Sequence, residues 1–244
     1  MSVAGRRVRT DDVEGRRARA EAVLAAAGGL IERWGFDKTT VEDVARAAGI
    51  AKGTVYLHWK TRDELFVAVL RRERVLMLAS VREGLAAEPG PRALFRHLAV
   101  ALMGRPLLRA VLLNDLGVLG RLAERMRSRT EWRPSFSDLL ALLRDHGAVD
   151  GARGELGQVT LVNAAYLGVL TTVSLLPEQA RLTDDEQADL IADMVVSTLG
   201  LGEGDDPAAL AAATAAYFES AFEVATDKLA EAMGLVPGNR GEGS

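Results

Sequence analysis

Apolar residues recur at every third or fourth position through most of this chain, which is the spacing of one face of an α-helix. No stretch alternates apolar and polar residues between turn signals, as a half-buried strand would. The pattern therefore predicts an all-α fold. Prolines and glycine-rich segments divide the later part of the chain, and helices are expected there at about 92–103, 106–128, 134–146, 154–176, 184–199 and 207–233.

Both ends of the chain are polar. Residues 1–15 are rich in arginine and have no apolar core, so they are predicted to be a disordered basic arm rather than a signal peptide. A first helix is expected from about Gly15 to Trp34, with Gly35 as its stop. Residues 235–244 are predicted to be a disordered tail.

Two segments carry the pattern of a capping box, in which a hydroxyl and an acidic residue three positions later cap each other's backbone. With Thr39 as the N-cap, Glu42 takes the third helical position. The helix that follows is expected at about 40–47. Thr61 and Glu64 form the second box, which opens a long helix.

A short turn follows the helix that Thr39 caps. It consists of Ala48-Gly49-Ile50, and Gly49 can take the left-handed conformation that other residues resist. The next helix is expected from about Lys52 to His58. Two short helices joined by a three-residue turn that contains glycine make a helix-turn-helix.

The second helix of this motif has an inner and an outer face. Val55 and Trp59 are expected to face the core, whereas Lys52 and Tyr56 share a different stripe. The amino end of a helix offers unpaired N–H groups and partial positive charge, which suit phosphate, and nearby hydroxyls and lysines reach phosphates or base edges. A core aromatic is the alternative for Tyr56, and a surface residue without a role is the alternative for His58. The residues expected to contact DNA are Thr39, Thr40, Lys52, Gly53, Thr54, Tyr56, Leu57, His58 and Lys60.

A long ordered pattern over about residues 25–70 carries a family resemblance. It reads Gly35-Phe36-Asp37-Lys38-Thr39-Thr40-Val41-Glu42-Asp43-Val44-Ala45, then Ala48-Gly49-Ile50, Lys52-Gly53-Thr54-Val55-Tyr56, His58-Trp59-Lys60 and Leu65. On these residues the chain resembles the TetR/AcrR family of one-component transcriptional regulators. It departs from the family at Ala51, where a serine or threonine cap is common, at Leu57, which bears on base preference, and at Trp59.

The resemblance implies a three-helix DNA-binding domain at 16–62 and a helical ligand-binding and dimerisation domain at 63–234. It also implies a cytoplasmic homodimer that binds double-stranded operator DNA as a repressor and is released by a small-molecule effector. In such a dimer, two recognition helices about one DNA turn apart, roughly 34–36 Å, enter successive major grooves.

The charge distribution bears on the same question. Residues 1–74 hold 15 Lys and Arg against 11 Asp and Glu, and the rest of the chain holds 15 against 23, within a formal net charge of -4. A basic head on an acidic body suits a polyanionic partner, but chance variation along a surface also produces a contrast of this size. The chain has no cysteine, which excludes disulfides and cysteine-based sites.

The stretch from Leu156 to Leu176 is uncharged and long enough to span a membrane. Its several polar residues and the lack of a flanking Lys/Arg cluster argue against a membrane span, so we expect a helix buried in a core or at a subunit interface.

Small residues on this helix, Ala164, Gly168 and Thr172, recur at four-residue spacing and would let a second helix approach closely. A dimer interface is the favoured interpretation, and internal packing is the alternative. The last helix, with Tyr217, Phe218 and Phe222, is expected to complete a four-helix contact.

An effector pocket should be mostly apolar with a few polar groups. The candidates are His97, Met103, Asn114, Trp132, Phe136, Asn163 and Tyr166, although for each of them taken singly an ordinary core or surface role is the favoured interpretation.

The sequence offers little support for other chemistry. His58, His97 and His146 share no metal-ligand spacing, and no nucleophile with a base, glycine-rich phosphate loop or carboxylate pair stands out. We therefore expect no catalytic residues, no metal and no cofactor. The competing hypotheses are a helical ligand-binding or scaffold protein that does not act on DNA, and a small helical enzyme.

Overall fold

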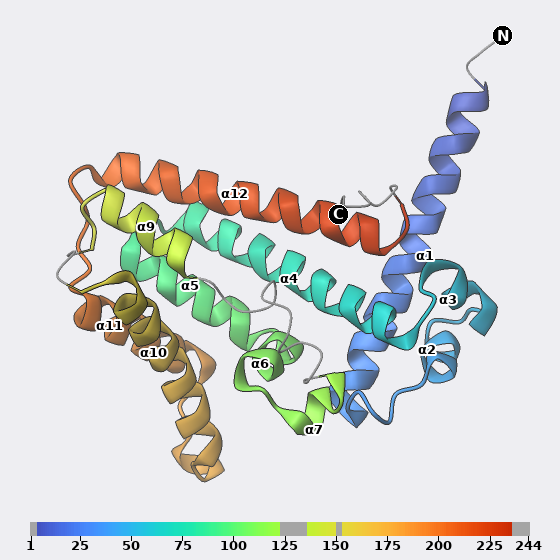
Figure 1. The fold of residues 1–244 in the computed structure, drawn as a ribbon, viewed down its shortest axis with the longest axis horizontal. Coiled ribbons are helices and arrows are strands. Elements are labelled where there is room, and N and C mark those ends of the chain that lie inside the picture. The colour runs from blue at the N-terminus through green and yellow to red at the C-terminus, as the bar shows by residue number, and fades with distance from the viewer. Residues whose placement is uncertain (1–3, 123–135, 150–152, 236–244) are drawn as a thin grey trace, which may run out of the picture.

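The computed structural model describes residues 4–122, 136–149 and 153–235, with side chains from Glu14 onward. Within these ranges every regular element is a helix, which confirms the all-α prediction. Figure 1 shows α4 running through the middle of the molecule, with α1, α2 and α3 at one end and α10 and α11 at the other. In chain order the elements are α1 (Ala4–Trp34), α2 (Val41–Ala47), α3 (Lys52–His58), α4 (Arg62–Ala87), α5 (Pro91–Met103), α6 (Pro106–Leu113), α7 (Leu116–Leu119), α9 (Ser137–Asp145), α10 (Glu155–Leu175), the 3-10 turn η2 (Glu178–Ala180), α11 (Asp184–Leu199) and α12 (Pro207–Ala232).

Helix α1 begins earlier than the sequence pattern predicts. It starts at Ala4, so the prediction of a disordered arm over residues 1–15 is wrong from Ala4 onward. The segment contains no proline, and the glycine at position 15 costs only about 1 kcal/mol relative to alanine, which does not interrupt a helix anchored further along. Of the predicted tail, 235–244, only Leu235 is described; it packs against the core of the head and its N–H donates to the Ala230 carbonyl, so the prediction is wrong for this residue. Residues 236–244 lie outside the described residues.

The N-terminal head consists of α1, α2 and α3 packed on the first half of α4. Its core is formed by apolar side chains spaced for one inward face on each helix, among them Leu24, Val44, Val55, Trp59 and Phe66, all of which are buried. Because three helices converge on these residues, the short α2 and α3 are held by packing rather than by their own length.

The body consists of the rest of α4 and the helices that follow. Helix α5 packs against α4 and α11, α10 packs against α11, and α12 lies along α4. Leu94, Phe95, Leu140, Tyr166 and Ile191 are fully buried in the centre of this second core. Helix α4 contributes to both cores, so it is the rigid connection between head and body.

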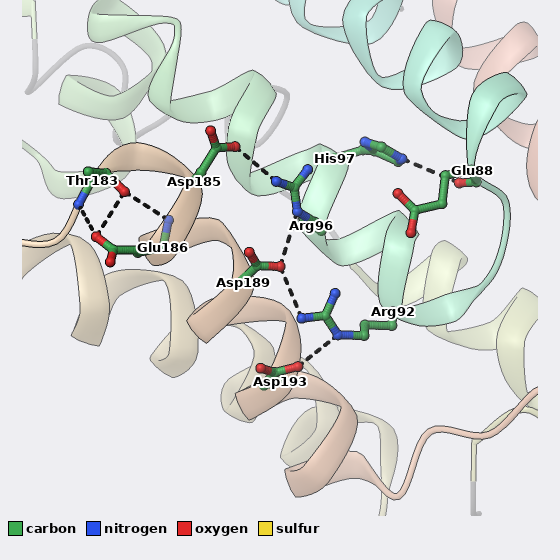
Figure 2. Close-up of polar contacts among 9 residues, drawn as sticks. All are labelled: Glu88, Arg92, Arg96, His97, Thr183, Asp185, Glu186, Asp189 and Asp193. Atoms are coloured by element: carbon green, nitrogen blue, oxygen red, sulfur yellow. Dashed lines mark hydrogen bonds and ion pairs between the residues drawn. The ribbon is translucent and has the colours of Figure 1, made fainter.

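An ion-pair ladder fixes α5 against α11 (Figure 2). Arg92 donates to Asp193 at 2.8 Å and to Asp189 at 3.0 Å, and Arg96 donates to Asp189 at 3.1 Å and to Asp185 at 2.9 Å. The two arginines of α5 and the three aspartates of α11 each recur at four-residue spacing, so each set lies on one face of its helix. The hydrogen bond from Arg92 holds the pKa of the Asp189 carboxyl below its ordinary value.

The helix expected at 106–128 is divided in the structure. Helix α6 ends at Asn114, whose φ of 52° is left-handed, and the Asp115 carboxylate then caps α7 by accepting from the N–H groups of Gly117 and Val118. Asparagine tolerates the left-handed region better than other side chains, and aspartate is a preferred N-cap, so the pair ends one helix and starts another.

Helix α10 is, among the described residues, the one helix long and apolar enough to cross a membrane, which by itself is weak evidence. Two of its polar side chains are buried: Gln158 accepts from Arg144 at 2.6 Å, and the Tyr166 hydroxyl donates to the Phe95 carbonyl at 2.8 Å. These contacts anchor one face of α10 in the body. Only 39% of its apolar window is buried within this protomer, so burial in the core accounts for one face of α10, and the subunit interface expected as the alternative stays a prediction for the rest.

Candidate nucleic-acid interface

The start of α2 is capped by Thr40, one residue later than predicted. The Thr40 hydroxyl accepts from the Asp43 N–H at 3.2 Å, and the Asp43 carboxylate accepts from the Thr40 N–H at 3.3 Å. The Thr40 hydroxyl also donates to the Asp43 carboxylate at 2.6 Å, and this hydrogen bond lowers the pKa of the Asp43 carboxyl. The capping box therefore uses Thr40 and Asp43 rather than Thr39 and Glu42.

Thr39 is fully buried, and its hydroxyl donates to the Gly35 carbonyl at 2.9 Å. Its expected role as a phosphate contact is therefore wrong: the side chain closes the turn after α1 instead. Thr40 is exposed beside it and keeps the position from which a cap can also reach a phosphate.

The turn between α2 and α3 has the predicted conformation. Gly49 has a φ of +68°, and Ile50 packs half-buried against the core of the head. Ala51 takes the N-cap position of α3 and provides no side-chain cap, so the first N–H groups of α3 keep their hydrogen-bonding capacity.

Helix α3 presents two distinct faces. Val55 and Trp59, 1% and 2% exposed, hold it to the head. On the opposite face Lys52, Tyr56 and Leu57 are exposed, and the side chain of Leu57 is 77% exposed to solvent. Gly53 beside Lys52 is exposed and has no heavy atom within 4 Å of the position a Cβ would take, so a polyanion backbone can approach closely there. Thr54 is half-buried next to it.

Lys52 already has an anionic partner within the chain. Its ammonium lies 3.3 Å from the Glu42 carboxylate of α2, and both side chains are more than half exposed. Exposed pairs of this kind contribute about 0 to 1 kcal/mol, so a phosphate can replace the carboxylate at little cost. Lys60, just past the end of α3, is also exposed.

His58 differs from the other candidates. It is half-buried, and its Nδ1 lies 3.0 Å from the carbonyl oxygen of Met233 at the end of α12. A carbonyl oxygen only accepts hydrogen bonds, so Nδ1 carries the proton and donates. This contact inside the chain occupies Nδ1, one of the two ring nitrogens. The expected DNA contact of His58 stays a prediction.

The last helix reaches the head, which sequence reasoning did not predict. Leu229 and Met233 are buried in the core of the head, and the Arg71 guanidinium of α4 donates to the Lys228 carbonyl at 3.1 Å. The apolar period of α12 marks these residues as inward-facing, but a periodic pattern does not say which core a helix joins.

The predicted effector-pocket residues are dispersed. Met103, Phe136 and Tyr166 are buried in the body core, where the Phe136 and Tyr166 rings lie 5.7 Å apart. Three others have different roles: His97 contacts the Glu88 carbonyl, Asn114 is exposed at the end of α6, and Asn163 donates to a carbonyl of its own helix. These contacts do not bring the three together in one apolar pocket, and a part in effector binding stays a prediction for each. Trp132 lies outside the described residues.

The predicted dimer residues differ in their exposure to solvent. Ala164, Gly168 and Thr172 are exposed along one side of α10. Phe218 is only 3% exposed and lies inside the protomer, so it is wrong as an interface residue, while Tyr217 and Phe222 are half-buried. Helix α12 lies along α4, whereas α10 lies against α11, so the two helices pack on different parts of the protomer. The expected four-helix contact between subunits stays a prediction.

Comparison with known proteins identifies the head. Residues 23–69 match the family model of bacterial regulatory proteins of the tetR family, and this match covers α2, α3 and parts of α1 and α4. The chain is 37% identical over 70 residues to the HTH-type transcriptional repressor Rv1474c of Mycobacterium tuberculosis, which is 28% of this chain and 37% of that protein. It is 32% identical over 140 residues to the HTH-type transcriptional repressor Rv3405c of the same organism, which is 57% of this chain and 66% of that protein.

The chain thus spans less than two thirds of the length of each of these relatives. Among solved structures, a putative TetR-family transcriptional regulator from Rhodococcus sp. superposes with a TM-score of 0.58 at 19% sequence identity. The match covers 74% of this chain and 98% of that chain. It therefore shows a shared helical fold, and about a quarter of this chain lies outside it.

Proposed function

Because this chain belongs to the TetR family of bacterial regulatory proteins through its N-terminal head, we propose that it is a cytoplasmic, homodimeric transcriptional regulator that binds double-stranded operator DNA. It acts by binding rather than by catalysis. We further propose that it is a repressor released from its operator by a small-molecule effector, as the family resemblance implies.

The observation that carries this proposal is the exposed face of α3. Its buried side, Val55 and Trp59, fixes the helix on the head, while Lys52, Tyr56 and Leu57 project into solvent with Gly53 between them. A helix supported from behind and free along its amino end can enter a major groove.

Each exposed residue of this face has a role in the proposed complex. The Lys52 ammonium and the uncapped amino end of α3 bind phosphate, as do Thr40 at the start of α2 and Lys60 beyond α3. Thr54, Tyr56 and Leu57 face the base edges, where hydroxyls bond to acceptors and the leucine packs on a thymine methyl group. Gly53 lets the DNA backbone approach.

The exposed stripe of Ala164, Gly168 and Thr172 on α10 supports a dimer interface in this proposal. A two-fold axis through α10 would bring the small residues of two protomers together and pair their recognition helices for a pseudo-palindromic site. The half-site spacing of such a dimer is about one turn of DNA, roughly 34–36 Å.

A mobility-shift titration tests the DNA-binding role. The full-length protein is titrated against a duplex from upstream of its own gene and against an unrelated duplex, at several salt concentrations. Preference for the upstream duplex supports the proposal. Equal and weak binding to both duplexes would favour the alternative, a helical ligand-binding or scaffold protein.

Two variants make this test specific to α3. Lys52→Ala is expected to weaken binding to every duplex and to lower the salt dependence by about one phosphate contact, whereas Tyr56→Ala is expected to reduce the preference for the upstream duplex. Arg153→Gln, which removes an exposed arginine far along the chain in the body, is the matched control for net charge. If the control and Lys52→Ala weaken binding equally, α3 is not the contact surface.

A further inference from the structure

A hollow of about 220 Å³ lies between α4 and α12, away from the DNA-binding face. The two helices run side by side in opposite directions (Figure 1). One end of the hollow is near the head, because Lys228 directly precedes Leu229, which is buried in the core of the head. The residues that line it are Arg71 and Arg74 from α4, and Tyr217, Ser220, Ala221, Val224, Ala225 and Lys228 from α12.

Three of these side chains are cationic, and no acidic residue is among the lining residues. Arg71 is fixed in place because its guanidinium donates to the Lys228 carbonyl at 3.1 Å. Lys228 is exposed, and the structure shows no ion-pair partner for its ammonium within the described ranges. Two helices distant in sequence thus bring three positive charges around one small space.

The rest of the lining is suited to the other end of an amphipathic molecule. Ala221, Val224 and Ala225 are apolar, and Val224 is 50% exposed, so an apolar chain can lie against it. Burial, reinforced by the nearby Asp138 carboxylate, raises the pKa of Tyr217, so its hydroxyl stays protonated and can donate to an anion.

We propose that this hollow between α4 and α12 binds a small organic anion, a carboxylate or phosphate ester with a short apolar chain. The anionic group lies among Arg71, Arg74 and Lys228, and the chain lies on Ala221 and Val224. Charge-assisted hydrogen bonds of this kind are the strong ones, and the guanidinium geometry suits both carboxylate and phosphate.

The hollow lies next to the part of α12 that packs against the head. Lys228 is followed directly by Leu229, which is buried in the core of the head, and the same last turns of α12 reach His58. An anion held between α4 and α12 therefore stabilises the seating of α12 against the head. That regulatory meaning rests on the proposed DNA-binding function, but anion binding itself does not.

Isothermal titration calorimetry on the full chain tests the site with four probes. Hexanoate and hexyl phosphate carry an anion and an apolar chain, hexanamide lacks the charge, and inorganic phosphate lacks the chain. We expect the two amphipathic anions to bind at one site per chain, and their relative affinities identify which anionic group the site prefers. Equal affinity for hexanoate and hexanamide would overturn the proposal.

Variants locate the binding. Arg74→Gln combined with Lys228→Gln is expected to weaken the tighter probe by about tenfold or more, because charged hydrogen bonds are lost. Val224→Trp, which fills the hollow from an exposed position, should weaken it without any change of charge, and Arg153→Gln should have no effect. Unchanged affinity in both site variants would overturn the proposal. The mobility shift without any probe reports the DNA-binding function separately, so either proposal can fail alone.

Discussion

The imidazole Nδ1 of His58 lies 3.0 Å from the carbonyl oxygen of Met233, which joins the end of the proposed recognition helix to the end of the last helix. The two residues are separated by 175 positions in the chain. Since Leu229 and Met233 are also buried in the head, the end of α12 belongs to the head by its packing although it starts in the body. A change in the position of α12 therefore acts directly on the support of α3.

Removing this bond is expected to loosen the end of α12. His58→Phe keeps a flat ring but leaves the Met233 carbonyl without its donor, and we expect a loss of about 1 kcal/mol of unfolding free energy. Hydrogen exchange should show the larger effect locally, as faster exchange in the last turns of α12. His58→Asn can still donate from its amide and is the partial rescue. Unchanged exchange in His58→Phe would mean that packing alone holds α12.

Substitution by alanine should have opposite effects on stability at Gly29, inside α1, and at Gly35, directly after it. At Gly35, φ is +79° and an added Cβ would lie 2.7 Å from the Gly117 carbonyl oxygen of the α7 segment, so Gly35→Ala is expected to cost more than about 1 kcal/mol. At Gly29, inside α1, a Cβ meets nothing within 4 Å, so Gly29→Ala should stabilise by up to about 1 kcal/mol. Chemical denaturation of both variants measures the difference. Equal effects would contradict the tight packing of α7 on the end of α1.

The contrast between head and body shows what the sequence could predict. In the head, local signals predicted several features correctly: the glycine at the α2–α3 turn, Thr61 as the N-cap of α4, and the four-residue spacing of Val55 and Trp59. The capping box expected at Thr61 is only half formed, because the Glu64 carboxylate accepts from the Lys60 N–H instead of the Thr61 N–H. The misplacement of the α2 cap by one residue arose because Thr39 and Thr40 both satisfy the capping pattern, and only burial of Thr39 distinguishes them.

In the body, the relevant facts are contacts between distant helices. Asn163 and Tyr166 lie on the same helix in similarly apolar sequence, yet one bonds within its own helix and the other crosses to Phe95. Helical period identifies the inward face but not the neighbour it meets, so the hollow between α4 and α12 and the contact of His58 were not predictable. The DNA-contact residues, apart from the buried Thr39, remain predictions for the experiments above.

The exposed stripe on α10 makes a prediction about assembly. An added Cβ at Gly168 meets nothing within 4 Å, so Gly168→Arg should leave the protomer folded while placing a charge in the proposed interface. In sedimentation velocity the variant should run as a monomer, whereas the unmodified chain is expected to run as a dimer. Gly168→Ala keeps the surface small and should remain dimeric. A dimer that persists in Gly168→Arg would place the interface elsewhere.

The ladder between α5 and α11 predicts a pH dependence of stability. The pKa of Asp189 is lowered in the folded protein, chiefly by the hydrogen bond from Arg92, so the folded state binds this proton less readily than the unfolded chain. The ionised Asp189 carboxylate therefore stabilises the folded state fully above the unfolded pKa of an aspartate, about 3.9. This stabilisation is lost as the pH falls through the lower pKa of the folded state. Because Asp189 is 44% exposed, solvent screening limits the contribution of the pairs to roughly 0.5–1 kcal/mol.

Thermal unfolding between pH 7 and pH 3 measures this effect, with Asp189→Asn as the comparison. Asparagine cannot ionise, so the variant should unfold at a lower temperature than the unmodified chain at pH 7, and the two curves should approach each other below pH 4. Asp227→Asn removes an exposed carboxylate of α12 outside the ladder and should leave the difference between pH 7 and pH 3 unchanged. High salt should also narrow the gap at pH 7, because exposed pairs are screened. A gap that is independent of both pH and salt would show that the ladder does not hold α5 on α11, and that the apolar contacts beneath it do so alone.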